Sequence, residues 1–197
     1  PILAFGDAVG NDALAVHNCL KKAGYDSIVA ADYVDERLGR DIAVSTEDLS
    51  FVEPEDIVIY HLSTGHRLNS RFGALNCRKI VKYHNITPPD FFFGYNKETV
   101  KACIAGYKEA AFLSDKPEFA FADSSYNKAE LRKLGFGCDI EVLPILIPFE
   151  DYEKEPDGEV LKEMDDGCTN IIFTGRVVPN KRQEDIIAAF HIYQKYY

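Results

Sequence analysis

The stretch Asp56-Ile-Val-Ile-Tyr-His61 decides the fold, because four apolar or aromatic residues follow one another in it without interruption. Its β-branched residues predict a strand. The absence of alternation between apolar and polar residues predicts that both faces of this strand are covered. A strand of this kind belongs in the interior of a parallel sheet with helices on both sides.

Short apolar runs and segments of helical period alternate on both sides of this strand. Further strands are predicted over residues 2–5, 27–31, 79–84, 119–122 and 140–143. Helices are predicted from a cap at Asn11 or Asp12, over residues 69–76 and 97–113, and from the capping-box pair Asn127 and Glu130 to Gly135. This order is typical of an α/β domain, so we predict a Rossmann-like, doubly wound parallel sheet.

Two regions carry more specific expectations. In the polar segment 32–56 we expect a short strand near Ile42 and a short helix capped near Ser45 or Thr46. In the helix over residues 97–113 we expect one buried stripe, formed by Val100, Ile104, Tyr107 and Ala111.

The domain organisation follows from a shift in composition. Residues 1–150 form one α/β domain, and the acidic stretch 151–168 has the composition of a linker with one short helix. The pattern then restarts with a strand over residues 170–174 and a helix from about Gln183, so residues 169–197 are expected to begin a second domain. The chain opens without Met and ends without a helix stop signal, from which we expect a segment of a longer protein.

Net charge and cysteine usage limit the partners and the compartment. The net charge of -10 repels nucleic acid and anionic lipid, so any anionic ligand must be held by a local cluster of cations. The five cysteines are far apart and form no CxxC pair, which predicts a reduced, cytoplasmic protein without a metal site. No apolar run approaches the roughly 18 residues of a membrane span.

Polar clusters follow four of the predicted strands. They are GDAVGND (6–12), HLSTGH (61–66), YHNITPPD (83–90) and TGRVVPNK (174–181). In a parallel sheet the loops at the carboxyl ends of the strands converge, and ligands bind there. We therefore expect these four clusters to form one site.

The first cluster is compatible with two interpretations. Gly6 and Gly10 allow close backbone approach, and a helix that begins at Asn11 would offer free N–H groups to a phosphate or a sugar hydroxyl. A tight turn that needs glycine only for packing explains the same residues equally well.

The histidines His61 and His84 both end strands. His84 is followed by Asn85 and the stiff Pro88-Pro89 pair, which would fix its ring over a cleft, so a functional role is favoured. For His61 the favoured interpretation is a satisfied core residue.

The fourth cluster carries the strongest signal for anion binding. Gly175 lets the backbone turn closely after the strand, the planar fork of Arg176 matches two phosphate oxygens, and Lys181 adds a second charge. Alone, this motif could also be a surface turn with two incidental cations.

In its order of motifs the chain resembles the retaining glycosyltransferases of family GT4. The resemblance rests on TGRVVPNK before a helix with Ile-Ile-Ala-Ala-Phe, on His84-Asn85 at a strand end, on Ser-Ser-Tyr-Asn-Lys at 124–128 and on VLPILIPFEDY at 142–152. It implies one half of a GT-B fold, with an acceptor-binding first domain and the start of a nucleotide-sugar-binding domain. It also implies that the family's EX7E motif would lie beyond Tyr197.

The resemblance assigns roles to residues of this chain. It implies that Arg176, Lys181 and Gly10 bind the donor diphosphate and that His84 lies beside the reacting sugar as the catalytic residue. Asn11, Asp12 and Asn85 are the implied acceptor or sugar contacts. The family's paired glycine in the first loop is replaced here by Val9-Gly10, which puts the loop geometry in doubt.

The implied activity is transfer of a sugar with retention from a UDP- or GDP-sugar to a glycan, lipid or other hydroxyl acceptor, without metal or cofactor. The partners expected are the donor and a glycan or lipid-linked acceptor but no nucleic acid, with peripheral membrane association of the full-length enzyme. The fragment alone is expected to be inactive. The last helix carries an apolar stripe, Ile186, Phe190 and Tyr193, that would pack on the first domain, pack on a second copy as a dimer, or stay loose.

Two other functions stay open. One is another GT-B enzyme, such as a nucleotide-sugar epimerase. The other is a non-catalytic module that recognises a glycan or a partner.

Overall fold

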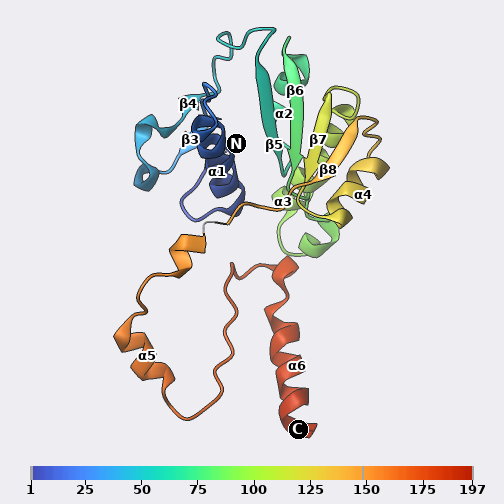
Figure 1. Cartoon of the computed structure of the whole chain (residues 1–197). Helices are drawn as coiled ribbons and strands as arrows, with labels where there is room; N and C mark the ends of the chain where they lie inside the picture. The colour runs from blue at the N-terminus through green and yellow to red at the C-terminus, as the bar shows by residue number, and fades with distance from the viewer. Residues whose placement is uncertain (1, 148, 197) are drawn as a thin grey trace.

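The computed structural model describes residues 2–147 and 149–196 and shows an α/β protein around a parallel sheet (Figure 1). The main sheet has four strands in the order β5-β6-β7-β8, so β5 lies at an edge and the prediction of an interior strand was wrong. Its strands are β5 (Ile57–Leu62), β6 (Arg78–Tyr83), β7 (Phe119–Ala122) and β8 (Asp139–Val142), and all three pairings are parallel. The predicted α/β class with a parallel sheet is therefore confirmed.

The remaining elements are helices and short strand pairs. The α-helices are α1 (Ala8–Lys22), α2 (Arg67–Ala74), α3 (Lys97–Phe112), α4 (Ser125–Lys133), α5 (Gly158–Met164) and α6 (Gln183–Tyr196). The 3-10 helices are η1 (Glu36–Leu38), η2 (Arg40–Ile42), η3 (Pro89–Phe92), η4 (Phe149–Tyr152) and η5 (Pro179–Lys181). The short strands β1 (Ile2–Leu3) and β3 (Tyr33–Val34) form one pair, and β2 (Ala30–Ala31) and β4 (Val44–Ser45) form another.

One face of the main sheet builds the hydrophobic core. Leu62 of β5, Val81 and Tyr83 of β6, and Ala120 and Ala122 of β7 point to this face and are fully buried. Residues of α3 and of the α4 region cover them, including Ala110, Leu113, Leu131 and Phe136. Because side chains alternate along a strand, the next residue of β6, Lys82, must point to the opposite face.

The opposite face of the sheet meets α1. Lys82 of β6 and Asp12 of α1 are both buried and in contact there. Helices therefore lie against both faces, as in a doubly wound fold.

Several predicted elements differ from the structure. The predicted strand 27–31 is reduced to Ala30–Ala31, and in place of a helix at Ser45 the segment forms η1, η2 and then β4. Helix α4 is capped by Ser124 rather than Asn127, since the Ser124 hydroxyl accepts the Asn127 N–H. The bounds predicted for the helix over 97–113 are close to those of α3, but its buried residues are Cys103, Gly106 and Ala110 rather than the expected stripe.

A pair of glycines explains the different stripe on α3. A Cβ atom on Gly106 would come within 2.7 Å of the Gly65 nitrogen, and one on Gly65 within 2.6 Å of the Ala102 carbonyl oxygen. The loop after β5 thus packs backbone to backbone on α3, which rotates the buried face of the helix toward Gly106. The apolar periodicity alone carries no sign of this contact.

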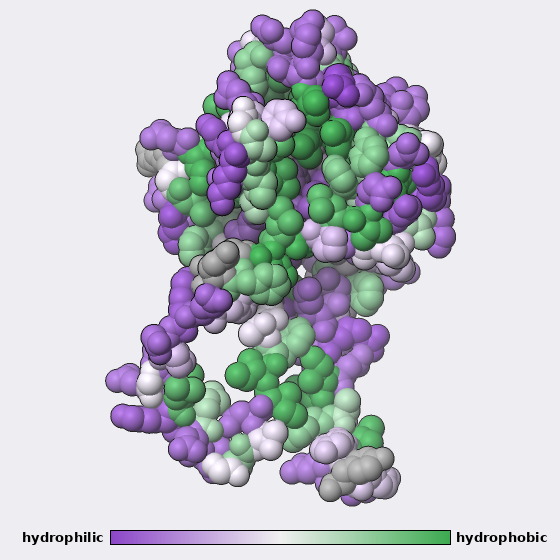
Figure 2. All heavy atoms as spheres, viewed as in Figure 1, coloured by the Kyte–Doolittle hydropathy of each residue, from purple (hydrophilic) through white to green (hydrophobic). Residues whose placement is uncertain are grey.

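Residues 149–196 are more open than the rest of the chain. As expected, the acidic stretch contains one short helix, α5, but the predicted strand over 170–174 is absent from the described structure, and α6 begins at Gln183 as predicted. Figure 2 shows apolar side chains on the surface of this part. The predicted stripe Ile186, Phe190 and Tyr193 is exposed. The turn η5 lies against η3 of the first domain.

Two observations on the described residues complete the fold. None of their helices has both the length and the apolarity that crossing a membrane would require. All five cysteines are free thiols.

We predict that Gly106→Ala destabilises the protein, because the added methyl group must separate two backbone segments. Overpacking of this kind costs about 1–3 kcal/mol. Denaturant unfolding monitored by circular dichroism measures the change. The matched control is Gly137→Ala, whose added methyl group meets nothing within 4 Å and whose φ is not positive. Equal stability of the two variants would contradict the proposed close contact.

Candidate functional site

Five charged or titratable side chains meet at the carboxyl ends of β5, β6 and β7. His61 lies near the end of β5, Lys82 and His84 at the end of β6, and Asp123 directly after β7. Asp12 reaches this group from the second turn of α1. Most of these side chains are buried, so their charges must be balanced within the cluster.

The ion pair of Lys82 and Asp12 is the most buried part of the cluster. Their side chains are 1% and 0% exposed. Lys82 Nζ donates to Asp12 Oδ1 at 2.9 Å and lies 2.7 Å from Oδ2. Asp12 Oδ1 also accepts the Leu146 N–H at 2.9 Å. One carboxylate thus joins α1, β6 and the segment that follows β8.

A chain of hydrogen bonds runs through the two histidines. His84 Nδ1 lies 2.8 Å from Asp123 Oδ2, and His84 Nε2 lies 2.8 Å from His61 Nδ1. The two rings are stacked with centroids 5.0 Å apart. Asp12 Oδ2 is 3.7 Å from both His61 Nδ1 and His84 Nε2.

The surroundings of His61 favour its neutral form. Burial lowers the pKa of His61, and the neighbouring His84 and Lys82 lower it further, while Asp12 partly opposes them. His61 is therefore neutral at physiological pH.

A second network fixes the turn that carries His84 and Asn85. The Tyr83 hydroxyl accepts the Ile86 N–H at 3.1 Å and donates to Glu130 at 2.5 Å, while the Tyr107 hydroxyl donates to the Ile86 carbonyl at 2.7 Å. Burial and the Glu130 carboxylate raise the pKa of both phenols, which stay protonated. The N–H and the carbonyl group of Ile86 are therefore both hydrogen-bonded to tyrosine hydroxyls.

The turn itself is unusual at Asn85. Its φ is +67°, in the left-handed region, and its Oδ1 is buried without a hydrogen-bond partner among the described residues. Backbone strain and unsatisfied polar atoms concentrate at functional sites.

The atoms of Asp12, His61 and His84 also approach one another as metal ligands do, within 4.8 Å. Two nitrogen ligands of a tetrahedral zinc ion would lie about 3.3 Å apart, whereas His61 Nδ1 and His84 Nε2 are 2.8 Å apart. Asp12 is already paired with Lys82. The hydrogen bond and the ion pair thus already engage these ligand atoms.

The structure changes the interpretation of the first loop. Helix α1 begins at Ala8, so the prediction of a helix start at Asn11 was wrong. Asp7 is the cap, and its carboxylate accepts the Gly10 N–H at 3.0 Å, so this N–H is not free for a phosphate in the structure. A Cβ on Gly10 would approach Leu3 to 3.1 Å, which supports the packing interpretation of this glycine.

The structure brings some of the predicted site residues together and leaves others apart. Asp12, His84 and Asn85 lie in or beside the cluster, whereas Asn11 is exposed on α1. Arg176 and Lys181 are also exposed, and the described contacts include none between either cation and the cluster. Their loop nevertheless approaches the site, because η5 lies against η3, the turn that follows His84 and Asn85.

Three residues of the site were missed in the sequence: Lys82, Asp123 and Glu130. Lys82 could have been found, since a lysine two positions before His84 on a strand shares its face. Asp123 directly follows a strand and could have been found by the same reasoning as the histidines. Glu130 was predicted only as a capping-box residue, and nothing in the sequence indicates its hydrogen bonds with Tyr83 and Tyr107.

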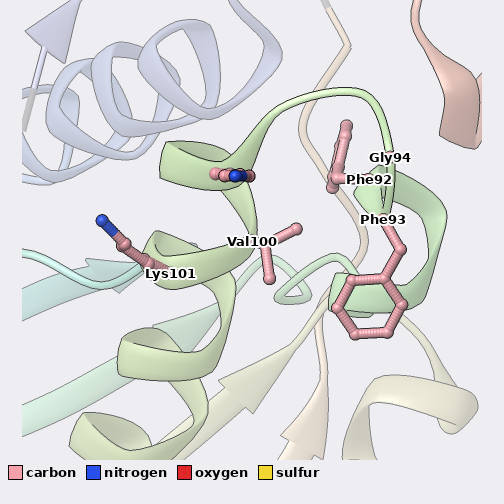
Figure 3. A pocket seen from close by; sticks show the side chains of 6 residues that line it. Phe92, Phe93, Gly94, Val100 and Lys101 are labelled. Atoms are coloured by element: carbon pink, nitrogen blue, oxygen red, sulfur yellow. The ribbon is translucent and has the colours of Figure 1, made fainter.

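A separate depression lies beside the cluster loops, between η3 and the start of α3 (Figure 3). It has a volume of about 360 Å³ and is lined by Phe92, Phe93, Gly94, Lys97, Val100 and Lys101. Phe93 is exposed beside this depression.

Comparison of the chain with protein-family models, with curated proteins and with solved structures found no match in any of the three.

We predict that Lys82→Met strongly destabilises the protein, because it leaves the buried Asp12 carboxylate without its cation. Breaking a buried pair from one side costs about 3–5 kcal/mol. The double variant Asp12→Asn with Lys82→Met removes both charges and should lose less stability than Lys82→Met alone. Urea unfolding of the two variants and of wild type measures the difference, and a larger loss in the double variant would refute the pairing.

We also predict a stability change that follows the charge of His61. Below the ordinary histidine pKa of about 6.5, the unfolded chain binds a proton at this position and the folded chain does not. The free energy of unfolding should therefore decrease as the pH is lowered from 7.5 to 5. His61→Gln should show a shallower decrease, measured by urea unfolding at each pH. If the free energy of unfolding decreased equally with pH in both proteins, His61 would be protonated in the folded state.

Proposed function

We propose that the chain is part of a retaining, metal-independent glycosyltransferase that uses a nucleotide-diphosphate sugar. The observation that carries the proposal is the contact between η5 and η3. It joins η5, which contains Lys181, to η3 in the loop that begins with His84 and Asn85. We infer that the cations and the hydrogen-bonding side chains of these two loops flank one site.

The two groups suit the two halves of a sugar donor. Departure of a diphosphate needs positive charge, which Arg176 and Lys181 would supply electrostatically. The sugar carries hydroxyl groups, which neutral imidazole, carboxylate and amide oxygens bind well. The fold supports the sugar half of this division, because the loop with His84 follows the carboxyl end of β6.

Two alternatives would use the same surfaces differently. A nucleotide-sugar epimerase needs an acid and a base on the sugar, and it would convert the donor without an acceptor. A glycan-binding module would bind the sugar without changing it. Assays of the donor alone, with product analysis, separate both from transfer.

The proposal predicts that Arg176→Ala in the complete gene product lowers transfer from a UDP- or GDP-sugar about a hundredfold or more, since loss of one charge-stabilising donor has such effects. The rate of sugar transfer is measured by the release of the nucleoside diphosphate. The control is Lys195→Ala, which removes one positive charge from the exposed face of α6 in the same part of the chain. A near-normal rate for Arg176→Ala would contradict the assignment of this loop to diphosphate binding.

A further inference from the structure

His61, rather than His84, offers an accessible ring nitrogen in this cluster. The His84 side chain is 1% exposed, and both its nitrogens are engaged, by Asp123 and by His61. The His61 side chain is 15% exposed. Its Nδ1 faces His84 and Asp12 in the interior, so Nε2 lies on the accessible side of the ring.

The hydrogen-bond chain relates the protons of the two rings. The Asp123 carboxylate accepts only, so the proton of the Asp123 contact lies on His84 Nδ1. With one proton on each ring, His84 presents a lone pair at Nε2, and the proton of the next contact comes from His61 Nδ1. His61 then has a lone pair at Nε2.

We propose that each ring carries one proton, that His61 Nε2 is the atom that meets the ligand, as an acceptor for a hydroxyl group of the sugar, and that Asp123 and His84 are positioning residues that set its tautomer. This inference rests on the proposed function for the identity of the ligand. A lone pair accepts from a hydroxyl group and repels a phosphate oxygen, so the position is specific for the sugar rather than the diphosphate.

The other charged groups around His61 agree with this role. Asp12 and Lys82 neutralise each other beside the ring, and Asp123 lies beyond His84. The lowered pKa of His61 keeps its lone pair free at physiological pH.

Accessibility is tested on the chain itself with diethylpyrocarbonate, which acylates unprotonated imidazole nitrogens. Mass spectrometry should find His61 modified at least tenfold faster than His84, with the exposed His191 as the reference for a free ring. Faster modification of His84 would overturn the proposal.

The positioning role is tested by nitrogen-15 spectra of the histidine rings, which report the tautomer. Wild type should show Nδ1–H at both His61 and His84. Asp123→Ala should release His84 to the Nε2–H form and convert His61 to Nε2–H as well, whereas Asp123→Asn should retain the wild-type tautomers because its amide oxygen still accepts. An Nε2–H form of His61 in wild type would contradict the proposed proton positions in the hydrogen-bond chain.

Ligand contact is tested by kinetics of the complete gene product. His61→Ala should lower kcat/KM for the donor sugar about tenfold, the loss expected for one hydrogen bond, while His191→Ala should not. An unchanged kcat/KM in His61→Ala would overturn the ligand contact. If wild type transfers no sugar at all, the proposed function fails, and the tautomer spectra still decide the positioning role separately.

Discussion

The ammonium group of Lys82 imposes the constraint on which the rest of the site depends. A lysine with 1% exposure cannot keep its charge without a carboxylate at contact distance, and Asp12 provides it. Because Asp12 is on α1 and also holds the Leu146 N–H, the same contact fixes a helix, a strand and the segment after the last strand. These three elements are separated by up to 134 residues of sequence.

The side chains of β6 enter an apolar core on one face of the sheet and a polar cluster on the other. Val81 and Tyr83 point into the core with α3 and α4, while Lys82 and His84 point toward α1. Tyr83 connects the two faces, since its hydroxyl holds the Ile86 N–H and thereby the turn after His84. The rigid core thus positions the polar cluster through backbone hydrogen bonds rather than through side-chain packing alone.

The sequence predicted those parts of the fold that depend on local pattern. The short apolar runs of β6 and β7 and the helical period of α3 have the predicted places, whereas β5 lies at an edge of the sheet and not in its interior. The predictions failed where one distant contact decides, as for the stripe of α3, which Gly65 rotates, and the start of α1, which Asp7 caps. In the site, His84 was recognised at a strand end, but Lys82 was missed because a lysine inside a strand is ordinarily taken for a surface residue. The positions of Asp123 and His61 at strand ends can be read from the sequence, but their contacts with His84 depend on the pairing of strands, which no local pattern contains.

The alternation along β6 has a consequence for how this strand tolerates insertion or deletion. A shift of one residue would turn Lys82 into the apolar core and Val81 toward Asp12, so both faces would lose their partners at once. Register in β6 is therefore enforced twice, by apolar burial on one side and by charge on the other. The strand can therefore change by substitution but not by insertion or deletion.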